Sequence, residues 1–216
     1  MIADFTYDPP PGDPVILFED TRLIAVDKPS GLLSVPGKLE GRQDCLIARL
    51  EAIRPGVLLV HRLDCDTSGV ILFAKDKKAQ GYLGQEFEKR RARKGYVARV
   101  WGRLEGEGRV DLPLCADWPN RPRQMVSHEH GRPAQTDWHA EDFDGTSTRV
   151  RLHPLTGRSH QLRVHMAELG HPILGDPIYT TGPARDFPRL MLHAEWLTLH
   201  HPEDGRTITF RAPCPF

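Results

Sequence analysis

Glycine and proline interrupt this chain so often that it has room only for short regular elements. Together they make up 38 of its 216 residues, and both residue types weaken the interiors of helices and strands. The longest apolar runs, at 57–60 and 70–74, are correspondingly short. A membrane-spanning helix needs roughly 20 mostly apolar residues, so we expect no membrane span and no membrane partner.

Length and composition predict one globular domain. A chain of 216 residues corresponds to about one domain, and we expect a loose arm over residues 1–14 followed by a single domain over 15–216. The first residues lack a basic region and an apolar stretch of the kind that directs export. The four cysteines include no C-x-x-C pair. We therefore expect a cytoplasmic protein with reduced cysteines.

Apolar periodicity predicts strands that alternate with a few helices. Strands are expected at 15–18, 23–26, 57–60, 70–74, 96–101, 136–143 and 150–155, with two more between 190 and 210. Helices are expected at 44–54, 76–94 and 159–169. Asp44, Asp76 and Ser159 are the predicted N-caps, and Gly170 is the predicted end of the last helix. The pattern favours an α/β (α+β) fold with antiparallel pairing over 110–150.

The charge is balanced over the whole chain and uneven along it. Lysine plus arginine equals aspartate plus glutamate at 29 each, yet seven cations stand between Glu88 and Arg103 against Glu88 alone. Tyr96 and Trp101 lie within this stretch. One interpretation is a solvated helix end, where cations complement the helix dipole. The other is a surface that holds RNA phosphates and stacks on unpaired bases.

Two polar clusters carry residues suited to chemistry. Asp64 follows His61 in a loop between two apolar strands, where a carboxylate can act as nucleophile or base; the alternative is a turn or cap residue. The segment 157–165 opens a helix with two arginines and two histidines, which suits anions; the alternative is a basic surface helix. His160 and His165 lie about 140° apart on a helix and cannot share a metal ion, so we expect no metal site there and predict packed or hydrogen-bonded histidines.

One competing motif is the D-x-D-x-T pattern of the haloacid dehalogenase phosphatases, which Asp64, Asp66 and Thr67 match. In that family the first aspartate directly ends a strand, whereas His61 and Arg62 intervene here. The second acidic pair is also missing, because Thr180 stands four residues after Asp176. A magnesium-dependent phosphatase is therefore the weaker alternative.

The segment 61–75, His-Arg-Leu-Asp-Cys-Asp-Thr-Ser-Gly-Val-Ile-Leu-Phe-Ala-Lys, resembles the H-R-L-D-x-x-T-S-G signature of the RluA family of pseudouridine synthases. Four further segments match the family in the same order: Lys28-Pro-Ser-Gly-Leu, Lys94-Gly-Tyr-Val-Ala, Thr156-Gly-Arg-Ser-His-Gln-Leu-Arg-Val-His and Gly170-His-Pro-Ile-Leu-Gly-Asp. Residues 111–122 and 131–136 are similar to the dual-specificity subgroup. The resemblance runs from about Val15 to Pro213. It implies a pseudouridine synthase fold, with a mixed, largely antiparallel sheet flanked by helices and loops around an RNA-binding cleft. Larger members of the family carry an N-terminal S4 domain; the 14 residues before the first expected strand are too few for one, so we expect no S4 domain.

The resemblance also implies roles for individual residues. Asp64 matches the catalytic aspartate, which breaks the N-glycosidic bond of a uridine so that the uracil turns and rejoins the ribose through carbon. Arg163 matches the arginine that keeps this carboxylate ionised, and Tyr96 matches the tyrosine that stacks on the uracil and helps to remove its C5 proton. Arg62 matches the residue associated with flipping the uridine. Leu192 matches an apolar residue that contacts the other side of the base; the alternative role for Leu192 is core packing. No cofactor is implied.

RNA is the expected partner. We expect its phosphates to be bound by the basic residues Lys89, Arg90, Arg91, Arg93, Lys94, Arg121 and Arg123. The subgroup resemblance implies a 23S rRNA stem-loop and the tRNA anticodon stem-loop as substrates, recognised by shape and splayed bases. We expect a monomer. A noncatalytic RNA-binding module remains an alternative that uses the same basic residues.

Overall fold

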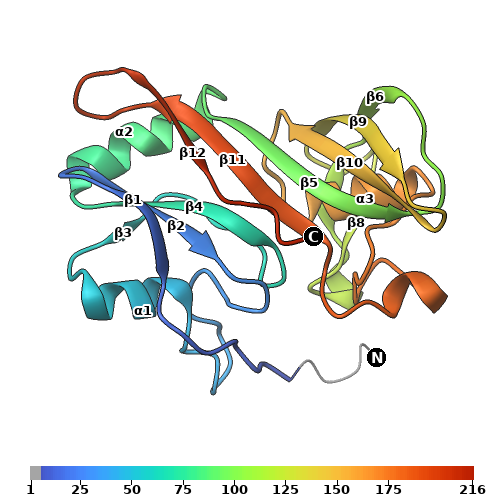
Figure 1. Ribbon diagram of the computed structural model, residues 1–216, viewed down its shortest axis with the longest axis horizontal. Coiled ribbons are helices and arrows are strands. Elements are labelled where there is room, and N and C mark those ends of the chain that lie inside the picture. The colour runs from blue at the N-terminus through green and yellow to red at the C-terminus, as the bar shows by residue number, and fades with distance from the viewer. Residues whose placement is uncertain (1–5) are drawn as a thin grey trace. The chain divides into compact units, whose positions relative to one another are not determined.

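The computed structural model describes residues 6–216, which form two compact units (Figure 1). We call residues 6–94 and 193–215 the Asp64 unit, and residues 95–192 and 216 the Arg163 unit. The chain leaves the Asp64 unit within one strand, at residue 94, and returns within another, at residue 193. The expectation of one catalytic domain over 15–216 stays a prediction.

The Asp64 unit is built on a mixed sheet. Its strands are β1 (Val15–Glu19), β2 (Leu23–Lys28), β3 (Leu58–Leu59), β4 (Ser68–Ala74), β11 (Leu192–His200) and β12 (Thr207–Arg211). The order is β1-β2-β4-β11, with β12 added to β11 and β3 to β4. β4 is buried over its whole length, as a central strand requires. It runs parallel to β11 and antiparallel to β2, with Ser68 opposite His193 and Ile71 opposite Val26.

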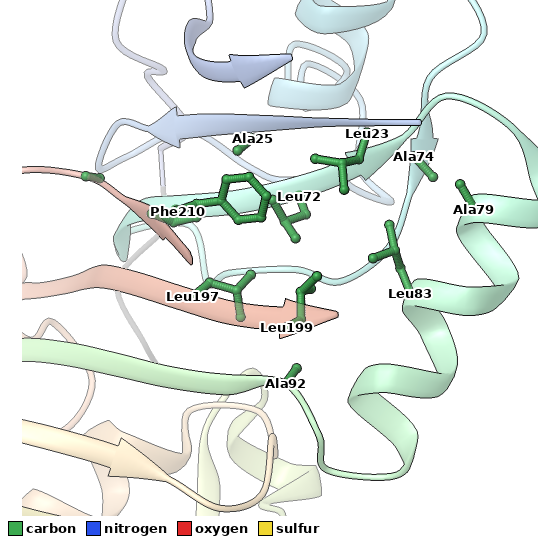
Figure 2. Packing of buried hydrophobic residues seen from close by; sticks show 12 residues of the cluster. Leu23, Ala25, Leu72, Ala74, Ala79, Leu83, Ala92, Leu197, Leu199 and Phe210 are labelled. Atoms are coloured by element: carbon green, nitrogen blue, oxygen red, sulfur yellow. The ribbon is translucent and has the colours of Figure 1, made fainter. Parts of the chain in front are cut away.

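Two helices cover this sheet, and Figure 1 shows its strands between them. They are α1 (Leu46–Ile53) and α2 (Lys77–Glu88). Ala79 and Leu83 of α2 point toward the sheet, where they meet Leu72, Leu199 and Phe210 in a buried cluster (Figure 2). The alternation of β2 and β4 therefore sends one set of apolar side chains toward α2, as a two-residue period requires.

The start of α2 follows the sequence prediction, and its end does not. Asp76 is the N-cap, and its Oδ1 accepts the backbone N–H of Ala79 at 2.9 Å. The helix ends at Glu88 because Arg90 adopts a left-handed backbone with φ 56°. The amides of Arg90 and Arg91 then bond back to the carbonyls of residues 87 and 86, as in a Schellman motif. The predicted extension to Lys94 is wrong, since that residue lies in β5 (Arg93–Trp101).

Two other predicted caps are also wrong. Cys45 occupies the N-cap position of α1, while the Asp44 carboxylate accepts two hydrogen bonds from the Arg49 guanidinium at 2.7 and 2.6 Å. His160, not Ser159, precedes α3 (Gln161–Glu168), and its backbone is left-handed with φ 54°. Gly170 follows α3 with φ 84°, as predicted.

The N-terminal arm is held where the structure describes it. Residues 1–5 lie outside the described part, and residues 6–14 form no helix or strand. Arg49 donates to the carbonyls of Pro10 at 2.8 Å and Gly12 at 2.9 Å, and the Tyr7 hydroxyl donates to the Asp44 carbonyl at 2.7 Å. The expectation of a loose arm is therefore wrong for residues 7–12.

The Arg163 unit is antiparallel. Its main strands have the order β5-β10-β9-β6, with β6 (Glu107–Asp111), β9 (Gln135–Phe143) and β10 (Ser147–Pro154), and a separate hairpin joins β7 (Leu114–Ala116) to β8 (Gln124–Val126). Two 3-10 turns complete it, η1 (Trp118–Asn120) and η2 (Gly182–Arg185). Leu162 and Met166 of α3 pack with Ala98, Val150 and Leu152. Because residues 161–166 are all buried, the interpretation of this segment as a basic surface helix is wrong.

The α/β (α+β) class and the mixed, largely antiparallel pairing are thus confirmed within the two units. Among residues 6–216 the longest helix, α2, has 12 residues, and none of the helices has the length and apolar character to cross a bilayer.

Replacing glycine by alanine is expected to have opposite effects on the free energy of unfolding at two positions. Gly69 in β4 has φ +109°, and a Cβ there would meet the Ala194 carbonyl oxygen at 2.2 Å. Gly81 lies inside α2, and a Cβ there would meet no atom within 4 Å. We expect Gly69→Ala to lower the free energy of unfolding by roughly 2 to 5 kcal/mol and Gly81→Ala to raise it by about 1 kcal/mol. Urea denaturation measures both, and equal effects of the two substitutions would contradict this packing.

Candidate active site

Asp64 lies in the loop that joins β3 to β4, as predicted. The residue is half-buried, its neighbour Leu63 is buried, and Arg62 is exposed. The carbonyl of Asp64 accepts the N–H of Thr67 at 3.2 Å, which closes a turn before β4 begins. The loop therefore directs one cation to solvent beside a carboxylate that is partly withdrawn from it.

A buried lysine holds the backbone of this loop. Lys28, at the end of β2, is 0% exposed. Its Nζ donates to the carbonyls of Pro29 at 2.9 Å, Leu32 at 2.6 Å and Cys65 at 2.7 Å. An ammonium group has three protons to donate, and burying one of them without an acceptor is costly. The three carbonyls satisfy the ammonium group, and the bond to Cys65 fixes the residue next to Asp64.

The segment 30–34 holds the rest of the loop in the same way. Ser34, 3% exposed, donates its hydroxyl to the Leu63 carbonyl at 2.8 Å and accepts the Leu63 N–H at 3.2 Å. Ser30 donates to the Asp66 carbonyl at 2.6 Å, and the Gly31 N–H donates to the Cys65 carbonyl at 3.0 Å. We call Lys28, Ser30, Gly31 and Ser34 the carbonyl clamp. It fixes the backbone on both sides of Asp64.

His61 anchors the start of the loop. Its Nε2 accepts the N–H of Leu72 in β4 at 3.1 Å, and its ring lies 4.5 Å from the Phe87 ring. Burial, with Lys94 as a smaller cause, lowers the pKa of His61 to about 3. The ring is therefore neutral at pH 7, with its proton on Nδ1 because Nε2 is an acceptor. Burial also raises the pKa of Cys65 to about 11, which leaves a thiol beside Asp64.

Arg163 is held by a carboxylate that the sequence analysis did not assign to it. Its Nε and Nη2 each donate to one oxygen of Asp176 at 2.7 Å, and the two side chains are 3% and 0% exposed. Such a two-bond pair fixes the plane of the guanidinium group. The chain before Asp176 passes close to Arg189, and only glycine fits at position 175. Its φ is +70°, and a Cβ there would meet the Arg189 carbonyl oxygen at 1.9 Å.

Tyr179 extends the framework around Arg163. The N–H of Tyr179 donates to Asp176 Oδ1 at 3.1 Å, and the Arg163 guanidinium carbon lies 5.1 Å from the Tyr179 ring centre. The Tyr179 hydroxyl lies 2.8 Å from His160 Nδ1, and burial raises its pKa to about 12. The phenol thus keeps its proton at pH 7, and it links the start of α3 to Asp176.

Tyr96 and Leu192 come together in the core of the Arg163 unit. Tyr96, in β5, is half-buried and packs against the cluster to which Leu192 and Leu162 belong. Leu192 is 3% exposed, so the structure gives it the core-packing role, and its contact with a base stays a prediction. Asp64 and Arg62 belong to the other unit, and the pairing of Asp64 with Arg163 also stays a prediction.

The basic stretch between Glu88 and Arg103 is less positive than its sequence indicates. Arg99 pairs with Asp144 at 2.8 Å and Arg103 with Glu105 at 2.6 Å, so these two cations are partly neutralised. Arg91 donates to the buried Glu86, which also accepts from His200. The net positive charge of the stretch is therefore smaller than the count of seven cations against Glu88 indicates.

The remaining cations of the stretch lie at the end of α2 and the start of β5. Lys89, Arg90 and Arg93 are exposed. Lys94 is half-buried, and burial lowers its pKa to about 8. In the Arg163 unit, Arg121 and Arg123 are exposed on the β7–β8 hairpin. These positions are accessible to a phosphate, and their contact with RNA stays a prediction.

His165 is a packed histidine, as expected. It is 0% exposed, with Nδ1 2.9 Å from Thr136 Oγ1 and Nε2 3.1 Å from the Leu112 carbonyl. Among residues 6–216, no group of three or more histidine, cysteine, aspartate or glutamate side chains is placed to hold a metal ion.

Comparison with known proteins identifies the family. A family model described as RNA pseudouridylate synthase matches residues 22–168. The dual-specificity RNA pseudouridine synthase RluA of Escherichia coli (strain K12) is 53% identical over 212 residues, which cover 96% of this chain and 97% of the relative. RluA of Vibrio vulnificus (strain CMCP6) is 49% identical over 216 residues, which cover 96% of this chain and 86% of the relative. The solved structure of human RNA pseudouridylate synthase domain containing 1 has a TM-score of 0.80 at 30% identity and covers 96% of this chain and 87% of that chain.

These similarities confirm the predicted fold and enzyme class, and they give no support to a phosphatase or a noncatalytic RNA-binding module. The chain belongs to the RluA family of RNA pseudouridine synthases.

Proposed function

We propose that Asp64 is the catalytic carboxylate with which this enzyme converts uridine to pseudouridine in structured RNA. The observation that carries the proposal is the carbonyl clamp, which fixes the backbone of residues 63, 65 and 66 around Asp64. Holding a reacting group in one position removes much of the entropic cost of reaching the transition state. A loop held this firmly fixes the backbone position from which the Asp64 carboxylate would reach a bound nucleotide.

The chemistry suits one carboxylate. Breaking the bond between N1 of uracil and C1′ of ribose develops positive charge on the sugar, which a nearby anion stabilises or captures. The uracil then turns, C5 bonds to C1′, the C5 proton leaves to solvent and N1 gains a proton. The atoms balance without an oxidant or a second substrate. Arg163, oriented by Asp176, would keep Asp64 ionised, because a neighbouring cation favours the charged form.

Three other residues complete the proposed site. Tyr96 would stack on the uracil and help to remove its C5 proton, and Leu192 would face the base from the other side. Arg62, exposed on the loop that carries Asp64, would fill the space that the flipped uridine leaves in the RNA.

We infer that the substrates are stem-loops, in 23S rRNA and in the tRNA anticodon arm. The support is the 53% identity to a relative named as dual-specific. The basic residues Lys89, Arg90, Arg91, Arg93, Lys94, Arg121 and Arg123 would bind RNA phosphates. We further infer a cytoplasmic monomer that works without cofactor or metal.

Release of tritium from C5-tritiated uridine tests the reaction, because the C5 proton must leave. We expect wild type to release tritium from an anticodon stem-loop or a 23S rRNA hairpin in the presence of EDTA. Asp64→Asn should lower the rate at least 10³-fold, on the order of the loss when a catalytic group is removed, since an amide supplies no anion to the developing charge.

Asp66→Asn is the matched control, since it lies in the same loop and belongs to the D-x-D-x-T motif. We expect it to retain activity. Equal losses in the two variants, or a requirement for magnesium, would contradict the assignment of Asp64.

Salt dependence tests the phosphate contacts. Arg93 is exposed, and Arg109, also exposed, is paired with the Asp137 carboxylate through Nε and Nη2. We expect Arg93→Ala to reduce the slope of log affinity against log salt by about 0.7, the value for one contact to single-stranded nucleic acid. Arg109→Ala should leave the slope unchanged. Titrations of a labelled stem-loop at several salt concentrations measure both slopes, and an unchanged slope for Arg93→Ala would remove it from the RNA surface.

A further inference from the structure

Trp118 stands apart from the other tryptophans. It is 66% exposed, whereas Trp101, Trp138 and Trp196 are half-buried. The Arg121 guanidinium carbon lies 4.0 Å from the Trp118 ring centre, and Arg121 Nε donates to the Trp118 carbonyl at 3.3 Å. One face of the indole is therefore covered by a cation. The rest of the ring is open to solvent, where a planar group can stack on it.

The turn that carries Trp118 is internally bonded. Asp117 accepts from Asn120 Nδ2 through both carboxylate oxygens at 3.0 Å, and its N–H donates to the Arg123 carbonyl at 3.0 Å. The Arg123 N–H donates to the Asn120 carbonyl at 3.1 Å. The only acid of the turn is thus bonded to an amide, while Arg121 and Arg123 remain exposed. The backbone of this turn is therefore held by its own hydrogen bonds, and Trp118 shares the turn with two exposed arginines.

The same framework holds this turn and Arg163. Arg123 Nη1 donates to the Ile178 carbonyl at 2.8 Å, and the Gln124 N–H donates to the Tyr179 hydroxyl at 2.7 Å. The N–H groups of Ile178 and Tyr179 donate in turn to Asp176, the partner of Arg163. Segment 176–179 therefore connects the Trp118 turn to Arg163 within the Arg163 unit.

We propose that Trp118, backed by Arg121, is a stacking platform for an unpaired base that flanks the target uridine. The inference rests on the proposed function for the identity of the RNA. Every base has a π-face, so a ring of this kind binds a splayed nucleotide without selecting its sequence, as an enzyme with more than one stem-loop substrate requires. Arg121 adds positive charge beside the ring, where the phosphates of that nucleotide would lie.

Binding of a labelled stem-loop tests the platform. We expect Trp118→Ala to weaken affinity by about 5- to 150-fold, the range for loss of one base–aromatic stack, with an unchanged salt slope. Trp118→Phe should restore most of the affinity. Phe143→Ala is the matched control, because Phe143 is an exposed ring with Arg103 4.9 Å from its centre in the same unit. It should bind RNA as wild type does.

A set of stem-loops, each with one loop base removed, identifies the partner of Trp118. Removal of one base beside the uridine should weaken RNA binding by wild type. The same removal should not further weaken RNA binding by Trp118→Ala. Equal affinity of wild type and Trp118→Ala, or additive effects for every abasic RNA, would overturn the platform. Tritium release by wild type from the intact RNA keeps this outcome distinct from failure of the proposed function, in which wild type releases no tritium from either stem-loop.

Discussion

The buried ammonium group of Lys28 is the interaction on which the proposed active site depends. It lies at the end of β2, next to the central strand β4, and its three bonds join residues 29 and 32 to Cys65. A charged side chain in this position is tolerated only because each proton finds a carbonyl. The same requirement ties the loop after β2 to the loop before β4, so the sheet itself determines where Asp64 stands.

The Arg163 unit fixes its charged side chain through a buried carboxylate. Asp176 accepts two bonds from Arg163 and two more from the backbone of residues 178 and 179. Because four donors converge on one buried carboxylate, the guanidinium group has a single orientation. The Tyr179 hydroxyl accepts the N–H of Gln124 in β8, which links the β7–β8 hairpin to the segment that holds Asp176. Each unit thus fixes one charged group that we assign to catalysis.

The sequence predicts what is local. Most of the strands, the Asp76 cap and Gly170 follow from apolar periodicity and from short-range hydrogen bonds, and the motifs identify the family. The short strands β6, β7 and β8 are not placed individually by the pattern, and the expected strand 57–60 is shortened to β3. The end of α2 is not predictable in this way, because Arg90 rather than glycine adopts the left-handed conformation. A count of charges along 88–103 also cannot show that Arg99 and Arg103 have acidic partners, one of them 45 residues away.

The supporting residues of the site were harder to predict than its reactive groups. Lys28 and Asp176 lie in segments that match the family, yet no spacing rule joins Lys28 to a carbonyl 37 residues away or Arg163 to a carboxylate 13 residues away. Ser34 gives no sequence signal, since a serine in a loop is ordinary. These contacts are set by how β2 and β4 pair and by how α3 meets the chain after Gly175.

The single-turnover rate of Ser34→Ala at saturating stem-loop RNA tests the central claim most directly. This change removes both side-chain bonds to the Leu63 backbone and leaves the carboxylate in place. At a temperature where urea titration shows the variant folded, the account predicts a rate about 10- to 100-fold below wild type, with unchanged RNA affinity. Thr21→Ala, which removes an exposed hydroxyl of the same unit, should not alter the rate. A wild-type rate for a folded Ser34→Ala would contradict the claim that the carbonyl clamp positions Asp64.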